Sequence, residues 1–271
     1  MKKLLRNCGG YDIPYCESSF DGTAVFFIHG NSAGKEIYEK QLNGAPGTKF
    51  KCIAFDLLGC GGLADKNYSE SELTFKNIIR VLFEFILSFD FKNYYIVAHS
   101  LGGHLILEGA QHLKGCKALF FSGVAPIGQS ENAESPFTNN PCINLLFQQH
   151  LNDIDTNNLL NCLIRPEQKE RTIISDLLKQ SNPLFRKALA NAFAAGEIAN
   201  EVKLFNSLNI PVYMVHCSDE KLINYNYLKQ FEENCWENKI NVFENCMHYS
   251  CLEDSEKFNA ELIRFINQVS N

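Results

Sequence analysis

One segment of the chain, residues 94–103, restricts the possible folds most strongly. It reads YYIVAHSLGG, an apolar run of β-forming residues that stops at Ser100. We interpret it as a strand, a sharp turn and the first turn of a helix, with Ser100 at the apex. Such a nucleophile elbow strains the serine backbone, so the positions two before and two after it must be small; Ala98 and Gly102 meet this requirement. The strand-then-helix context favours a catalytic serine over an ordinary turn serine.

Further apolar runs of strand length alternate with helical patterns. A strand that is apolar along its whole length is typical of a mostly parallel sheet that is covered on both faces. The runs cover residues 24–28, 52–56, 118–123, 210–216 and 239–243, and an edge hairpin is expected over 11–20, turning at Asp21-Gly22. Helical patterns follow at 35–42, after the capping box Ser69-x-x-Glu72, at 224–233 and at the C-terminal end. This order predicts an α/β fold with a doubly wound, mostly parallel sheet.

The alternation of strands and helices stops between residues 126 and 200. Clusters of Asn, Gln and Ser separate short amphipathic helical patterns there, and no buried strand is evident. Because a crossover between parallel strands needs only about a dozen residues, this stretch is too long to be a simple connection. We therefore predict an α/β core made of residues 1–125 and 201–271, with a helical lid inserted at residues 126–200.

Composition excludes several classes of function. A chain of 271 residues with 45% hydrophobic and 21% charged residues is typical of a soluble globular protein. Its formal net charge is -6 and it has no basic stripe, which argues against nucleic acid as a partner. No apolar run reaches the ~18 to 20 residues of a membrane span, and the N-terminus lacks the pattern of a signal peptide. The expected location is the cytoplasm, and no protein partner or membrane contact is indicated.

The eleven cysteines contain no Cys-x-x-Cys pair, and several lie inside apolar runs. This distribution favours free, buried thiols in a reducing compartment over a disulfide framework. No His-x-His-x-Asp-His cluster is present either, so a metal-dependent route to lactone hydrolysis is not indicated. We expect neither a metal nor a cofactor.

A serine nucleophile needs a base within hydrogen-bond reach, and the base needs an acid that orients it. His248 lies in the loop after the last predicted strand, where a parallel sheet returns it to the elbow, so we predict that it is the base. The acid is expected in the loop after the strand that ends at His216. That loop offers two adjacent carboxylates, Asp219 and Glu220, and the pattern alone does not choose between them.

An oxyanion hole requires two backbone N–H donors. One is expected from Leu101, the residue after the nucleophile, and the other from the loop after the first buried strand, where Gly30-Asn31 lets the backbone approach the substrate. Two interpretations of the Asn31 side chain stay open: it orients the substrate carbonyl, or it only accommodates an unusual turn. For His29 and Asp56, which also end strands, we favour structural roles in organising loops.

These motifs, taken together, resemble the α/β-hydrolase superfamily over nearly the whole chain outside the lid. Residues 28–32 (IHGNS), 100–104 (SLGGH) and 218–220 (SDE) look more narrowly like the metal-independent N-acyl homoserine lactonases of that fold. The resemblance implies that the acid of the catalytic triad is Glu220, with Asp219 as the fallback. It also implies that Asn31 contacts the lactone.

The sequence departs from this family at several positions. Ala98 replaces the first elbow glycine, Cys60 stands where a histidine is usual, and Met247 replaces the glycine before the catalytic histidine. Residues 150–165 contain no tyrosine to match the one that helps to hold the lactone ring.

The predicted function is a cofactor-free serine hydrolase that cleaves a small carboxylic ester or lactone through an acyl-enzyme, N-acyl homoserine lactones included. Two alternatives stay open. One is a perhydrolase or acyltransferase that uses the same triad, and the other is a hydrolase-fold ligand sensor with slow or no turnover.

Overall fold

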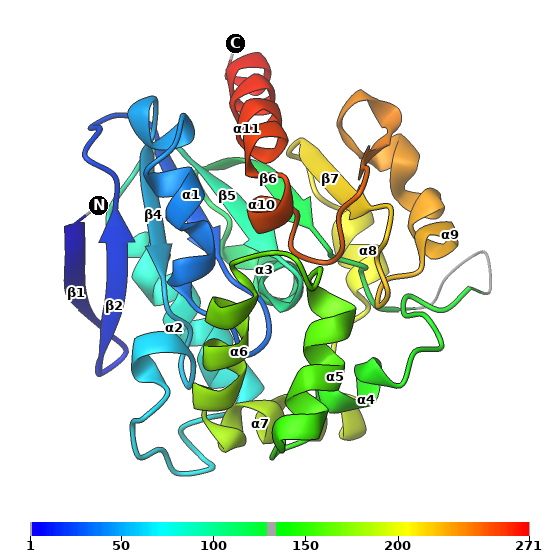
Figure 1. Cartoon of the computed structure of the whole chain (residues 1–271). Coiled ribbons are helices and arrows are strands. Elements are labelled where there is room, and N and C mark those ends of the chain that lie inside the picture. Colours follow the sequence, from blue (N-terminus) through cyan, green and yellow to red (C-terminus); the bar gives the residue numbers. More distant parts are fainter. Residues whose placement is uncertain (1, 129–133, 271) are drawn as a thin grey trace.

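The computed structural model describes residues 2–128 and 134–270, which are built around an eight-stranded sheet (Figure 1). The strand order is β1-β2-β4-β3-β5-β6-β7-β8. Every neighbouring pair from β4 to β8 is parallel, whereas the β1–β2 and β2–β4 pairs are antiparallel. The predicted mostly parallel α/β sheet is therefore confirmed. The strands are β1 (Lys2–Cys8), β2 (Tyr11–Glu17), β3 (Ala24–Ile28), β4 (Lys51–Phe55), β5 (Tyr94–His99), β6 (Cys116–Ser122), β7 (Val212–Cys217) and β8 (Ile240–Phe243).

Strand β3 shows why the central strands are apolar along their whole length. Phe26 and Ile28 belong to the core on one face of the sheet, and Val25 and Phe27 belong to the core on the other. All four side chains are fully buried. Helices α2 (Phe75–Leu87) and α3 (Leu101–Glu108) cover the first face, and α1 (Glu39–Leu42) and α11 (Ser255–Val269) cover the second. Side chains on both faces of each strand therefore have to be apolar.

The N-terminal hairpin differs from the prediction. It pairs β1 with β2 over residues 2–17 and turns at Gly9 and Gly10, not at Asp21-Gly22. Both glycines have positive φ, 59° and 85°, as a two-residue turn of a twisted hairpin requires. β1 escaped detection because it is an edge strand whose side chains are mostly exposed.

Helix α2 begins later than the capping box indicated. Ser69 and Glu72 do exchange hydrogen bonds, but they close a turn that precedes the helix. The N-cap is Thr74, whose side chain accepts from the Asn77 N–H at 3.2 Å. No helix within residues 2–128 and 134–270 is long and apolar enough to cross a membrane.

Between β6 and β7 the chain contributes helices but no strand to the sheet in the part described. We call residues 134–200 the helical segment; α5, α6 and α7 gather together in it (Figure 1). Helix α8 (Glu201–Asn206) then leads back to the sheet. The helices here are α4 (Cys142–Leu145), α5 (Asp153–Leu163), α6 (Arg171–Gln180) and α7 (Pro183–Ala194); α9 (Tyr225–Leu228) and α10 (Ser250–Glu253) follow β7 and β8.

The prediction that all cysteines are free thiols is wrong for one pair. Cys142 at the start of α4 and Cys162 near the end of α5 form a disulfide across 20 residues of sequence. The other nine cysteines are free and buried. The pair escaped prediction because the packing of α4 against α5, and not the spacing of the cysteines, brings the sulfur atoms together.

Candidate active site

Ser100 lies at the apex of a sharp turn between β5 and α3. Its backbone has φ 50° and ψ -123°, a conformation that a non-glycine residue adopts only under strain. The Ser100 N–H donates to the carbonyl of Ser122 on the neighbouring strand at 2.9 Å, which fixes the apex against the sheet. At Gly102 an added Cβ would lie 2.7 Å from the carbonyl oxygen of Ile28. The predicted requirement for a small residue two positions after the serine thus has a visible cause, the close approach of α3 to β3.

Glu220 and His248 are held together beside the elbow. The Nδ1 atom of His248 lies 2.7 Å from Oε2 of Glu220, and both side chains are almost completely buried. Oε1 of Glu220 accepts the Leu222 N–H at 2.9 Å. Burial alone would raise the pKa of the Glu220 carboxyl, but the His248 imidazole and the hydrogen bonds that it accepts hold that pKa below its ordinary value.

Asp219 lies elsewhere. Its exposed side chain pairs with Arg165 and with the hydroxyl of Ser218. Of the two candidate acids, the structure brings only Glu220 to His248. Because an ionised carboxylate can only accept, the proton of the shared bond resides on Nδ1 of His248.

Two residues that the sequence did not single out hold His248 in place. Nε2 of His99 donates to the carbonyl of His248 at 3.0 Å, and the two rings meet edge to face at 4.7 Å. Burial lowers the pKa of His99 well below its ordinary range, so this ring stays neutral. Gly123, at the end of β6, has φ +65°, and an added Cβ would lie 2.8 Å from Cε1 of His248. The only sequence feature that pointed to this close contact with His248 was a glycine at the end of a strand.

The predicted oxyanion donors lie on both sides of Ser100. A Cβ added to Gly30 would lie 3.0 Å from Cβ of Ser100, so the backbone at this position passes directly beside Ser100. The N–H groups of Asn31 and Leu101 donate to no carbonyl within the described ranges. Neither N–H group is therefore occupied by a backbone carbonyl of the described residues, which is the condition that the predicted oxyanion hole requires.

The Asn31 side chain connects the loop after β3 to the helical segment. Its Nδ2 donates to the carbonyl of Leu146 at 2.8 Å, and its Oδ1 accepts from the hydroxyl of Ser32 at 2.8 Å. The left-handed residue of this turn is Ser32, with φ 52°, and not Asn31. The structure thus gives the Asn31 side chain a bridging position, which neither interpretation of the sequence described.

His29 and Asp56 organise the loops around the site, as the sequence favoured. Nε2 of His29 accepts the Leu57 N–H at 3.0 Å, and its Nδ1 donates to the carbonyl of Gly30 at 2.9 Å. Asp56 accepts the N–H groups of Lys35 and Gly62, each at 2.9 Å.

A cavity opens directly at Ser100, and we call it the Ser100 cavity. Its volume, counted as the space that the centre of a water molecule can occupy, is about 50 Å³. Besides Ser100 its polar lining residues are Asn31, His104 and Glu201. The remaining wall is apolar, and includes Phe75, Leu146, Phe147, Leu189, Phe193 and Ile198. The walls come from α2, α3 and the helical segment together.

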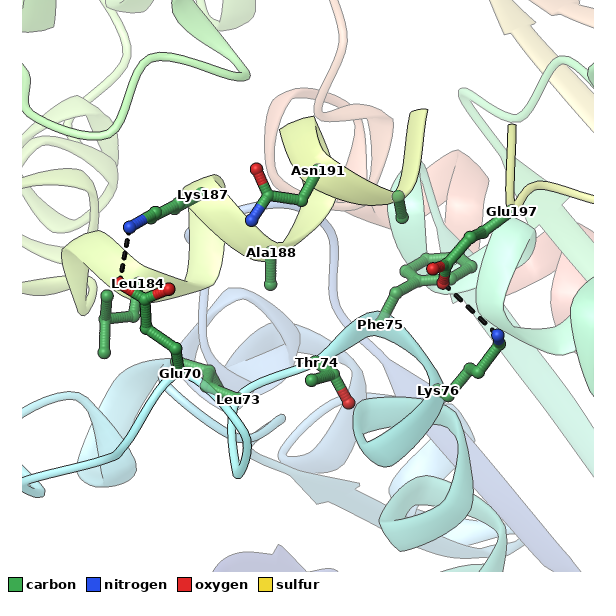
Figure 2. Close-up of a pocket in the computed structure, with 11 residues that line it drawn as sticks. Glu70, Leu73, Thr74, Phe75, Lys76, Leu184, Lys187, Ala188, Asn191 and Glu197 are labelled. Atoms are coloured by element: carbon green, nitrogen blue, oxygen red, sulfur yellow. Dashed lines mark hydrogen bonds and ion pairs between the residues drawn. The ribbon is translucent and has the colours of Figure 1, made fainter. Parts of the chain in front are cut away.

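A larger cavity of about 310 Å³ lies between the start of α2 and α7, and shares only Phe75 with the Ser100 cavity (Figure 2). Two ion pairs border it, Lys187 with Glu70 and Lys76 with Glu197, and each joins the helical segment to the sheet domain. None of the described residues that line it is a serine or a histidine. Among the described residues no group of three or more His, Cys, Asp or Glu side chains is arranged to hold a metal ion.

Comparison with known proteins agrees with this geometry. The model of the Alpha/beta hydrolase family matches residues 25–261. The AB hydrolase superfamily protein YisY of Bacillus subtilis is 22% identical over 93% of this chain and 95% of its own. The structure of the N-acyl homoserine lactonase AidH complexed with N-butanoyl homoserine matches with a TM-score of 0.91 and 23% identity, over 100% of this chain and 98% of the other. An esterase (EaEST) from Exiguobacterium antarcticum matches with a TM-score of 0.81 and 16% identity, over 98% and 100%. The family match spans most of the chain, and the chain therefore belongs to the alpha/beta hydrolase family.

Proposed function

We propose that this protein is a serine hydrolase that cleaves a small carboxylic ester or lactone through an acyl-enzyme. The observation that carries the proposal is the buried bond between Glu220 and His248 at 2.7 Å, with the His248 ring packed against His99, the residue before a strained serine whose backbone begins a helix. An esterase and a lactonase among the structural neighbours fit the same reaction class.

In the proposed mechanism Oγ of Ser100 attacks the substrate carbonyl carbon while Nε2 of His248 takes the hydroxyl proton. The N–H groups of Leu101 and Asn31 stabilise the resulting oxyanion. His248 then returns the proton to the leaving alcohol oxygen as the C–O bond breaks, which leaves an acyl group on Ser100. A water molecule, deprotonated by His248, hydrolyses that ester and restores the serine. Glu220 holds the imidazole in the required tautomer throughout.

The size of the Ser100 cavity favours a short acyl group. A cavity must offer roughly 10–15 Å³ to the centre of a water molecule in order to hold one. If each non-hydrogen atom of an acyl chain is counted as one water molecule, a cavity of about 50 Å³ takes roughly three to five such atoms. We propose that the helical segment acts as a lid that sets this limit, since it supplies most of the apolar wall. N-acyl homoserine lactones, the class of lactone for which the AidH enzyme is named, would need the lid to move outward.

Labelling and kinetics together test the function. A fluorophosphonate should label the folded wild type and leave Ser100→Ala unlabelled. Initial rates on p-nitrophenyl esters of graded chain length, measured beside N-acyl homoserine lactones, should be highest for short acyl groups and lost in Ser100→Ala. Wild-type protein that is unlabelled and inert on every substrate would contradict the proposal and favour a ligand sensor. Acyl transfer to a competing acceptor in preference to water would instead identify a transferase.

A further inference from the structure

A buried imidazole–carboxylate pair lies in the wall of the Ser100 cavity, apart from the pair that serves Ser100. Nδ1 of His104 on α3 is 2.7 Å from Oε2 of Glu201, the first residue of α8. The same Oε2 accepts the Ile127 N–H at 2.7 Å. Glu201 is fully buried and His104 is 8% exposed. The mechanism proposed above uses neither residue.

Both members of this pair keep an unused polar atom. Oε1 of Glu201 is buried and has no hydrogen-bond partner among the described residues. Nε2 of His104 likewise forms no hydrogen bond within residues 2–128 and 134–270. A buried carboxylate oxygen without a partner is costly, and in native proteins it usually marks a place where a water molecule or a ligand binds. The same cavity is lined mainly by apolar side chains, among them Ile127, Leu189 and Ile198.

The position of the pair fixes which part of a substrate would meet it. Ser100 caps α3, His104 lies four positions later on that helix, and both residues line the same small cavity. An acyl group on Ser100 would therefore reach the pair within its first few carbon atoms. A hydroxyl on such a carbon can donate to a carboxylate or imidazole acceptor and can accept from an imidazole N–H.

We propose that His104 and Glu201 form a subsite for a hydroxyl group on a short acyl chain, so that the preferred substrates are esters or lactones of short hydroxy acids. The inference rests on the proposed function and specifies its substrate class. A 3-hydroxybutyryl group fits the available space, because it places four non-hydrogen atoms beyond its carbonyl carbon in a cavity that takes roughly three to five.

The test compares p-nitrophenyl butyrate with the two enantiomers of p-nitrophenyl 3-hydroxybutyrate, which differ from it by one hydroxyl group. For the wild type, kcat/KM should be higher for one hydroxy ester by about tenfold or more, as expected for one buried hydrogen bond that would otherwise be missing. A ratio near one for both enantiomers, with turnover that depends on Ser100, would overturn the subsite and leave the hydrolase function intact.

Variants identify the groups responsible. His104→Phe and Glu201→Gln should each bring the ratio of the two kcat/KM values close to one. His112→Phe, which changes a histidine outside the Ser100 cavity just after the same helix, should retain the wild-type ratio. A preference that survives in both folded variants would contradict the proposal. Circular dichroism and a cooperative unfolding transition establish that each variant is folded.

Binding measurements test the subsite without catalysis, and also apply if the buried variants fail to fold. Ser100→Ala protein is titrated by calorimetry with butyramide and with 3-hydroxybutyramide. Binding that is about tenfold tighter for the hydroxy amide supports the subsite even if no ester is hydrolysed. Equal affinities, or no binding of either amide, would refute it whatever the outcome of the labelling experiment.

Discussion

Nη1 of Arg186 donates to Oγ of Ser32 at 2.9 Å, which links a buried arginine of α7 to the loop beside Ser100. The arginine is 3% exposed and has no carboxylate partner in the part of the chain that is described. Its other donors reach the backbone carbonyls of Leu178, Gln148 and Gln149. Burial lowers the pKa of this guanidinium. The Ser32 hydroxyl in turn donates to Oδ1 of Asn31. The Arg186 side chain therefore orders both the helical segment and the loop that contains Asn31 and Ser32.

Replacing Arg186 should therefore reduce both stability and turnover. Arg186→Met removes the donor that three backbone carbonyls and the buried Ser32 hydroxyl share, and should lower the free energy of unfolding by about 2–4 kcal/mol. kcat should fall more than KM rises, because the Asn31 N–H loses its support. Urea unfolding and ester kinetics measure the two effects. Arg80→Met, at an exposed arginine of α2, is the control and should change neither; equal effects of the two substitutions would contradict this role.

The two adjacent acids of the 218–220 loop should behave differently. Glu220→Gln retains the shape of the side chain but no longer holds His248 in the tautomer that a base needs, so kcat should fall on the order of 10⁴-fold. Asp219→Asn only weakens a surface pair with Arg165 and should leave kcat within about twofold, with a stability change of about 0.5 kcal/mol or less. Matching losses in both variants would show that the buried pair does not define the catalytic acid.

Gly123 and Gly196 provide a matched test of the space around His248. Both have φ +65°, so an alanine at either costs about 1–2 kcal/mol of backbone strain. At Gly196 nothing lies within 4 Å of the added Cβ, whereas at Gly123 it would meet the His248 ring. Gly123→Ala should therefore lower kcat strongly and Gly196→Ala should not, although both lower the melting temperature. If the two variants had equal kcat, the ring would not depend on this glycine.

Stability should fall as the pH decreases below about 6.5. Nε2 of His29 accepts the Leu57 N–H, so the folded protein cannot protonate it without breaking that bond, and burial lowers the pKa of His29 below its ordinary value. Below about 6.5 the unfolded chain then binds more protons than the folded one, so protonation favours unfolding. The slope for this one imidazole is at most about 1.4 kcal/mol per pH unit. Urea unfolding at pH 7.5, 6.5 and 5.5 measures it.

The comparison with His29→Asn isolates this contribution. Burial raises the pKa of Glu108 and Glu253, which opposes the trend at acidic pH, so the wild-type slope alone is a sum. His29→Asn should show a smaller slope than the wild type, even if it is less stable at pH 7.5. His150→Asn, at an exposed histidine, should keep the wild-type slope. An unchanged slope in His29→Asn would exclude His29 as the source.

The sheet and the elbow could be predicted because their causes are local. A strand buried on both faces has to be apolar throughout, as in β3, and the turn at Ser100 requires small neighbours. The edge strand β1 carries no such requirement, and its exposed side chains gave no signal.

The remaining parts of the site depend on contacts between distant segments. His104 and Glu201 are 97 residues apart, and Arg186 and Ser32 are 154 residues apart. The hydrophobic periodicity of a sequence predicts local helices and strands, and it does not predict contacts between residues so far apart. The choice between Asp219 and Glu220 depends on how one turn directs two neighbouring side chains, which physical patterns in the sequence left open.

The nine free cysteines have a practical consequence, because all of them are buried. Burial raises their thiol pKa values, to about 12 for Cys52, Cys116, Cys235 and Cys246. Since only the thiolate reacts readily with alkylating reagents, the native protein should be almost inert to them. Alkylation of a given cysteine therefore indicates that the structure around it has opened. The order in which mass spectrometry finds these positions modified would rank, without any introduced label, how easily each region of the molecule opens.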